Sequence, residues 1–166
     1  MNEATRTMIV MDAGASRFQF RAGALIRTEG HILIHRAVGD RGWCLPGGRV
    51  EMRETSAETL AREIEEEIGS AATIGELRFV IENFFELGGR ATHEIGFYFD
   101  ATLLKPLPFK EDGIVHRVRD GDVELEFCWV LPTISRLDEF QLVPRPLRRL
   151  LGDGQTGFAH LVHRDS

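Results

Sequence analysis

The chain has 166 residues, of which 43% are hydrophobic and 28% are charged, and its formal net charge is −6. This length and composition suit one globular domain and exclude low-complexity and fibrous classes. The acidic balance argues against general nucleic-acid binding, which needs a basic stripe, although metal ions would let an acidic protein bind phosphates. No secretory signal and no run of about 18 apolar residues occurs, so we expect a cytoplasmic protein without a membrane span.

The first regular elements in chain order are predicted strands. Apolar runs over residues 18–27 and 31–36 predict two strands, and Thr28-Glu29-Gly30 between them is a hairpin signal. A short apolar run follows at Trp43-Cys44-Leu45, and it ends at Pro46-Gly47-Gly48. A glycine pair at the end of a strand lets the backbone turn tightly and bring a carbonyl close to a ligand.

The clearest helix is predicted over residues 56–68. Thr55 and Glu58 form a capping box at its start, and Gly69 ends it. Its apolar residues recur at spacings of three and four, as expected for a buried stripe: Ala57, Leu60, Ala61, Ile64 and Ile68.

The remainder of the chain predicts more strands and two short helices. The strands are expected over residues 76–85, 94–104 and 123–131, and the helices over 135–140 and 145–151. Residues 105–122 hold prolines, glycines and mixed charges, which predict a long loop.

The domain organisation is simple. Residues 1–16 show no clear period, and we expect a flexible N-terminal arm there. Residues 17–152 form one predicted α/β domain, without an internal repeat or a linker, and residues 153–166 are expected to be a C-terminal tail.

The residues that point to chemistry are three glutamates on the helix. Glu63, Glu66 and Glu67 are related by spacings of three and four, so their side chains share one face, whereas Glu65 points elsewhere. Such a cluster repels itself by roughly 0.2–0.5 kcal/mol per pair, and it opposes the helix dipole in the C-terminal half. Helix energetics alone leaves two interpretations open: a solvated acidic face, or a site for a hard cation such as Mg²⁺.

The flanking residues resemble a known signature. The stretch resembles the Nudix box, written Gly, five residues, Glu, seven residues, Arg-Glu-apolar-X-Glu-Glu-X-Gly-apolar. The matching positions are Gly48, Glu54, Arg62, Glu63, Ile64, Glu66, Glu67 and Gly69. One position departs, because Ser70 stands where the box has an apolar residue. The likeness extends more loosely to Trp43–Gly48, Thr92–Phe97, Phe127–Val130 and the region after Pro144, about 130 residues in all.

The resemblance implies a fold and a set of roles. The fold is a Nudix-like α/β/α sandwich with a mixed β-sheet and a loop–helix–loop catalytic motif. The implied ligands of Mg²⁺ or Mn²⁺ are Glu63, Glu66, Glu67 and the carbonyl of Gly47. The expected catalytic residues are Arg62 and Glu66 of the box and Glu94 outside it, the last because its position at the start of a strand would bring it toward the box. The expected supporting residues are Gly48, Glu51, Glu54 and Gly69. Arg62 is expected to orient glutamates, and Glu54 to support the junction of loop and helix.

The resemblance further implies hydrolysis of a diphosphate bond in a nucleoside diphosphate linked to another moiety, with water attacking phosphorus. The general base is open: Glu66 and Glu67 are candidates within the box, and Glu94 is the candidate outside it. Glu51 is the alternative to Glu94 for a supporting or metal-binding role. The substrate is expected to be a small nucleotide derivative, and a homodimer is the oligomer to test first. The alternative is a catalytically silent module that senses nucleotides or binds RNA.

Overall fold

The computed structural model describes residues 5–165, and these form nine strands and three helices. The strands are β1 (Val10–Ala13), β2 (Ser16–Thr28), β3 (His31–Ala37), β4 (Gly47–Arg49), β5 (Ala72–Leu87), β6 (Arg90–Leu103), β7 (His116–Asp120), β8 (Val123–Val130) and β9 (Ala159–Arg164). The helices are α1 (Ser56–Ile68), α2 (Ile134–Glu139) and α3 (Pro146–Gly152). Within residues 5–165, no helix is long and apolar enough to cross a membrane.

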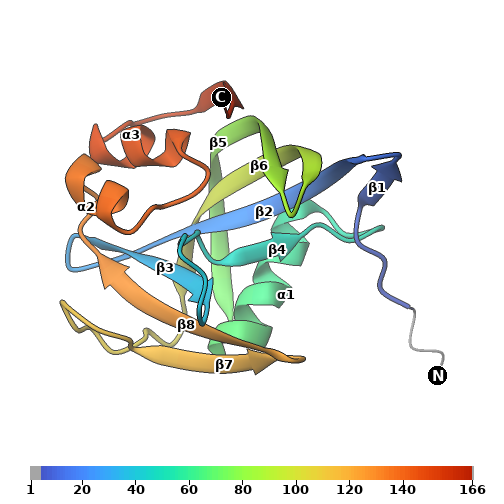
Figure 1. Cartoon of the computed structure of the whole chain (residues 1–166). Helices are drawn as coiled ribbons and strands as arrows, with labels where there is room; N and C mark the ends of the chain where they lie inside the picture. Colours follow the sequence, from blue (N-terminus) through green and yellow to red (C-terminus); the bar gives the residue numbers. More distant parts are fainter. Residues whose placement is uncertain (1–4, 166) are drawn as a thin grey trace.

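The sheet is mixed and is organised around the long strand β2. One edge of β2 runs parallel to β6, with Ser16–Ile26 beside Ala91–Ala101. Its other edge pairs antiparallel with β1, β4 and β3 in turn. The main path through the sheet is β7-β8-β3-β2-β6-β5-β9 (Figure 1).

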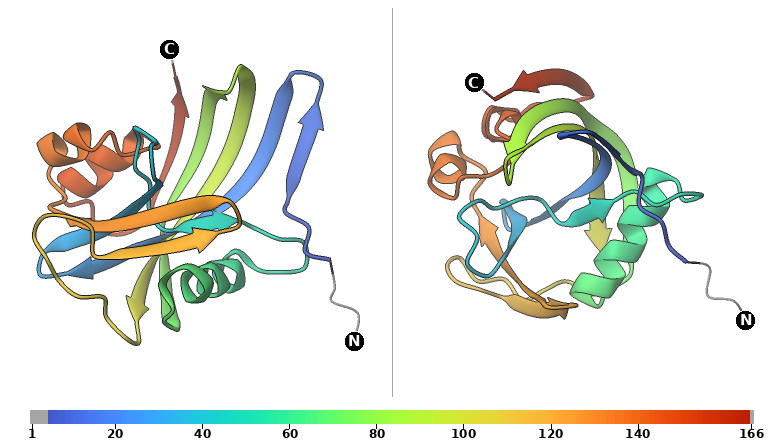
Figure 2. Two further views of the ribbon diagram at one scale, coloured as in Figure 1. Left: turned by 60° about the horizontal axis from the view of Figure 1, so that its bottom comes forward. Right: turned by 45° about the vertical axis from the view of Figure 1, so that its right-hand side comes forward.

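Helices cover the sheet on both sides, so there are two hydrophobic cores. Leu60, Ile64 and Ile68 of α1 pack with Ala22, Ala24 and Phe99 on one face. On the other face, residues of α2 and α3 pack with Leu25, Phe79 and Tyr98. Figures 1 and 2 show α1 and the α2–α3 pair on opposite sides of the sheet. The predicted α/β/α arrangement with a mixed sheet is confirmed.

The short strand expected at Trp43–Leu45 is instead β4, Gly47–Arg49, which contains the glycine pair. Three further segments differ from the prediction because each contains an edge strand. In the predicted arm, residues 10–13 form β1, which turns back onto β2 at Gly14, a residue with a φ of 59°. In the predicted loop 105–122, residues 116–120 form β7 beside β8. In the predicted tail, residues 159–164 form β9, parallel to β5 (Figure 2). Residues 1–4 of the arm and residue 166 of the tail lie outside the described residues.

Helix α1 begins and ends where its local signals predict. The Thr55 side chain accepts a hydrogen bond from the backbone N–H of Glu58, and the Glu58 carboxylate accepts one from the N–H of Thr55. Gly69 has a φ of 79° and closes the helix in the left-handed conformation. The capping box and the C-terminal glycine together set the register of the whole acidic face.

Replacing Leu60 by Ala tests how strongly α1 depends on its apolar stripe. Leu60 is fully buried against the sheet, so Leu60→Ala is expected to lower the free energy of unfolding by about 2–5 kcal/mol. Urea denaturation measures this change. Glu65→Ala, at an exposed position of the same helix, is the control and should change stability by less than about 0.5 kcal/mol. Equal effects of the two substitutions would contradict this packing.

Candidate active site

Two glycines of β4 allow the acidic helix to approach the sheet closely. Gly47 and Gly48 pair with Gly23 and Ala22 of β2. A Cβ on Gly47 would lie 2.0 Å from the carbonyl oxygen of Ala22. A Cβ on Gly48 would lie 2.8 Å from Cδ of Glu63. No residue with a side chain fits at either position without displacement, so Gly47 lets β4 lie close to β2 and Gly48 leaves room for the Glu63 carboxylate.

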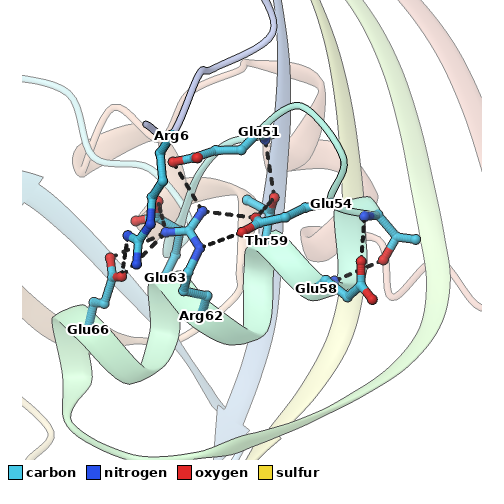
Figure 3. A network of polar contacts seen from close by, with 9 residues as sticks. Arg6, Glu51, Glu54, Glu58, Thr59, Arg62, Glu63 and Glu66 are labelled. Carbon is cyan, nitrogen blue, oxygen red and sulfur yellow. Dashed lines mark hydrogen bonds and ion pairs between the residues drawn. The ribbon is translucent and has the colours of Figure 1, made fainter. Parts of the chain in front are cut away.

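Arg62 lies at the centre of a network of carboxylates (Figure 3). Its Nε and Nη2 donate to the two oxygens of Glu54, at 2.9 and 3.0 Å. Its Nη1 lies 3.2 Å from Glu63 and 3.3 Å from Glu66. The hydrogen bonds to Glu54, together with the charges of Glu54, Glu63 and Glu66, hold the pKa of Arg62 above its usual range. This is the arrangement that the predicted orienting role of Arg62 requires.

The two supporting glutamates lie in the loop before α1. Glu54 also accepts a hydrogen bond from the Thr59 hydroxyl, so it joins the loop to the first turns of the helix. The Arg62 hydrogen bond is the main reason that the pKa of Glu54 is lowered. Glu51 is buried, and its Oε1 lies 3.4 Å from Nη2 of Arg62. Both therefore contact Arg62, as expected of residues that hold the loop against the helix.

The three glutamates of α1 differ in exposure. The Glu67 side chain is 9% exposed, Glu63 is 18% exposed and Glu66 is 44% exposed. Burial, followed by the charge of Glu63, raises the pKa of Glu67 to about 8. Burial also raises the pKa of Glu63. Each carboxylate would be stabilised in its charged form by a nearby cation.

Two histidines of the sheet lie beside Glu67. His116 Nε2 lies 2.7 Å from the backbone oxygen of Glu67, and His35 Nδ1 lies 4.0 Å from its Oε2. Burial and the nearby Arg21 lower the pKa of His35 to about 3, so His35 carries no positive charge beside Glu67. Among the described residues, Oε2 of Glu67 has no hydrogen-bond partner.

A cavity of about 180 Å³ opens beside these glutamates. Its lining residues are Glu63, Glu66 and Glu67 from α1, and Val118, Arg119, Asp120 and Gly121 from the end of β7 and the turn to β8. Asp120 adds a carboxylate that the sequence did not identify as part of the site, because the segment was predicted to be a loop. The hairpin between β7 and β8 forms the second wall.

The donor atoms around the cavity suit a hard divalent cation. They are carboxylate oxygens, and a buried one, Oε2 of Glu67, is unpaired within residues 5–165. In the same part of the chain, no three acidic, histidine or cysteine side chains converge in ligand geometry. Glu63 and Glu66 instead pair with arginines, Glu63 with Arg62 and Glu66 with both Arg62 and Arg6. The chemistry of the donors therefore fits Mg²⁺ or Mn²⁺, and binding requires these carboxylates to turn from the arginines.

Glu94, the candidate base outside the box, lies elsewhere. It is buried in β6 and accepts a hydrogen bond from Gln19 of β2. Side chains alternate along a strand, so Glu94 shares the face of Tyr98, which packs in the core beneath α2 and α3. Phe97 and Phe99 point to the α1 face instead. Glu94 does not line the cavity formed by the glutamates of α1, although the charge of Arg21 interacts with both Glu94 and Glu67.

Sequence reasoning also missed two arginines near the site. Arg21 of β2 donates to the Leu45 carbonyl at 3.2 Å, and its charge acts on both Glu67 and His35. Arg6 lies before β1, and its Nη1 is 2.6 Å from Oε1 of Glu66. Arg21 was missed because it lies within a predicted apolar strand, where nothing in the sequence indicates a functional charge. Arg6 was missed because only the pairing of distant backbone segments brings it to the site.

Comparison with known proteins places these features in a family. A NUDIX domain model matches residues 17–146. The chain is 39% identical over 62 residues to a MutT-like protein of Streptomyces ambofaciens, covering 37% of this chain and 40% of that protein. It is 38% identical over 74 residues to a CTP pyrophosphohydrolase of Escherichia coli, covering 42% of this chain and 53% of that protein. These matches thus span about half or less of the curated relatives.

Solved structures show the same fold. A NUDIX hydrolase from Nitrosomonas europaea superposes with a TM-score of 0.61 at 18% identity, covering 99% of this chain and 98% of that one. This similarity extends over β1 and β9, beyond the matched domain model. Because the NUDIX domain model matches most of its length, the chain belongs to the NUDIX domain family.

Proposed function

We propose that this protein is a metal-dependent hydrolase that cleaves a diphosphate bond in a small nucleotide derivative by attack of water on phosphorus. The observation that carries the proposal is the unpaired, buried oxygen of Glu67 beside Glu63 and Glu66 at a cavity of about 180 Å³. Unpaired buried carboxylates are costly, and a divalent cation is the partner that suits them. The family membership of the chain supports the same reaction class.

The residues that would hold Mg²⁺ or Mn²⁺ are Glu63, Glu66 and Glu67, together with the carbonyl of Gly47. When bound, such an ion supplies positive charge for the diphosphate oxygens and acidifies water beside the phosphorus. Gly48 leaves room for the Glu63 carboxylate, and Arg62 holds the loop residue Glu54 against the helix. Gly69 fixes the end of α1 and therefore the direction in which Glu66 and Glu67 point.

Glu66 is the proposed general base. It is the most exposed of the three glutamates and lines the cavity, so its carboxylate can accept the proton of the attacking water. Glu67 is less suited, because its side chain is only 9% exposed. Glu94 is left out of the proposed mechanism, since it does not line the cavity and its carboxylate accepts a hydrogen bond from Gln19.

A substrate panel tests the function. Nucleoside triphosphates, with CTP included because one relative is named a CTP pyrophosphohydrolase, ADP-ribose, dinucleoside polyphosphates and capped RNA are incubated with Mg²⁺ or Mn²⁺. We expect phosphorylated products from at least one of them, with turnover lost in EDTA and restored by the metal. Nucleotide binding without turnover would instead support the silent sensing or RNA-binding module.

Substitutions on α1 test the assignment of the helix face. Glu66→Gln and Glu67→Gln keep the side-chain shape and remove the charge, so each is expected to lower kcat by roughly 100-fold or more. Glu65→Gln is the matched control, because Glu65 is exposed on the same helix and points away from the cavity. Steady-state kinetics on the best substrate of the panel measures all three. A loss of kcat in Glu65→Gln similar to that in Glu66→Gln and Glu67→Gln would overturn the assignment.

A methyl group at Gly48 tests the placement of Glu63. Gly48→Ala puts a Cβ 2.8 Å from the Glu63 carboxyl carbon, so the carboxylate must move. Displacement of about 1 Å at a catalytic group lowers the rate by as much as ~100-fold, and we expect kcat to fall by about 10- to 100-fold. Gly42→Ala is the control, because its nearest neighbour would be at 3.4 Å. Unchanged kcat in Gly48→Ala would show that the position of Glu63 does not matter.

A further inference from the structure

Arg6 is carried to the acidic cluster by the segment that precedes β1. The N–H of Ile9 donates to the carbonyl of Val50, and the N–H of Met52 donates to the carbonyl of Thr7, both at 2.8 Å. Residues 7–9 therefore run antiparallel to residues 50–52, between β4 and the start of α1. This pairing places Arg6 over α1, where its Nη1 lies 2.6 Å from Glu66 (Figure 3).

The two arginines of the cluster differ in what they are free to bind. Arg62 is 18% exposed and contacts the carboxylates of four glutamates, Glu54 through two hydrogen bonds. Arg6 is 56% exposed, and within the described chain it forms one ion pair, with Glu66. An exposed ion pair of this kind is weak and exchanges readily for another anion. Arg6, unlike Arg62, can therefore change partner without disrupting the loop.

The cavity needs cations from the chain if it is to hold a diphosphate. Four of its lining residues are acidic, namely Glu63, Glu66, Glu67 and Asp120, against the single lining arginine Arg119. A divalent ion offsets part of this charge, but a diphosphate brings further negative charge. Guanidinium groups bind phosphate oxygens through paired hydrogen bonds. Arg6 does not line the cavity itself, but it pairs with Glu66, which does.

We propose that Arg6 is a substrate-binding residue, whose guanidinium exchanges the carboxylate of Glu66 for the diphosphate of the bound substrate. The inference rests on the proposed function, because it takes the diphosphate to lie in the cavity beside α1. The exchange also removes one of the two arginines that pair with Glu66, the other being Arg62. The segment before β1 thereby becomes part of the binding site, although it precedes the matched NUDIX domain.

Binding of inorganic pyrophosphate tests the proposal without turnover. Isothermal titration with Mg²⁺ present compares the full-length protein with Arg6→Ala, Arg6→Lys and Arg149→Ala. Arg6→Ala is expected to weaken pyrophosphate binding by about 10- to 100-fold, as for loss of hydrogen bonds to a charged group. Arg6→Lys should recover part of the affinity. Arg149 is exposed on α3, across the sheet from α1, and Arg149→Ala should bind as the unsubstituted protein does.

Kinetics and stability separate binding from a structural role. Arg6→Ala should raise KM for the best substrate about as much as it weakens pyrophosphate binding, with kcat changed less and the melting temperature unchanged. A lowered melting temperature with unchanged pyrophosphate affinity would overturn the proposal, since Arg6 would then only stabilise the loop. Tighter binding of Mn²⁺ alone with unchanged pyrophosphate affinity would also overturn it, because Arg6 would be only a counter-ion of Glu66.

Two further outcomes distinguish this inference from the proposed function. If pyrophosphate affinity depends on Arg6 but no nucleotide of the panel is hydrolysed, the binding role stands and the hydrolase function fails. If nucleotides are hydrolysed and Arg6→Ala behaves as Arg149→Ala does, the function stands and the role of Arg6 fails. Loss of affinity in Arg119→Ala but not in Arg6→Ala would assign the diphosphate to the opposite wall of the cavity.

Discussion

The site depends on the paired hydrogen bonds between Arg62 and Glu54. Glutamates 63, 66 and 67 repel one another, and no basic residue occupies the last turn of α1 to offset the helix dipole. Arg62 offsets part of this repulsion, because it contacts Glu63 and Glu66 while Glu54 fixes the plane of its guanidinium. The same contact ties the loop after β4 to the helix. One guanidinium thus sets both the charge balance of the cluster and the path of the loop.

The contact can form only because β4 brings the loop close to α1. Gly48 lies so near Glu63 that even a Cβ would contact the carboxylate, and Gly47 lies closer still to the backbone of β2. The two glycines belong to the strand that pairs with the middle of β2, and the helix packs its apolar stripe on the same face. Close packing at β4 and the electrostatic network of Arg62 therefore depend on each other.

Sequence signals that act over a few residues predicted helix α1 correctly, whereas the edge strands β1, β7 and β9 were not predicted. The limits of α1 follow from Thr55, Glu58 and Gly69, whose interactions lie within a few residues along the chain. Strands β1, β7 and β9 are short, and their outward residues are polar or exposed. β9 forms because its backbone pairs with β5, whose sequence lies some 80 residues earlier, and no pattern within β9 encodes that partner.

The same distinction explains which site residues could be found. Helical spacing placed Glu63, Glu66 and Glu67 on one face, since that geometry is local. The face on which Glu94 lies depends on its register with Gln19 of β2, and that register is a property of the whole sheet. The position of Arg6 depends on the backbone pairing of residues 7–9 with residues 50–52, and the Arg6 side chain takes no part in that pairing. The acidic residues of the site can therefore be identified from the helix alone. The arginines that pair with them, such as Arg6, are identified only once distant strands are in place.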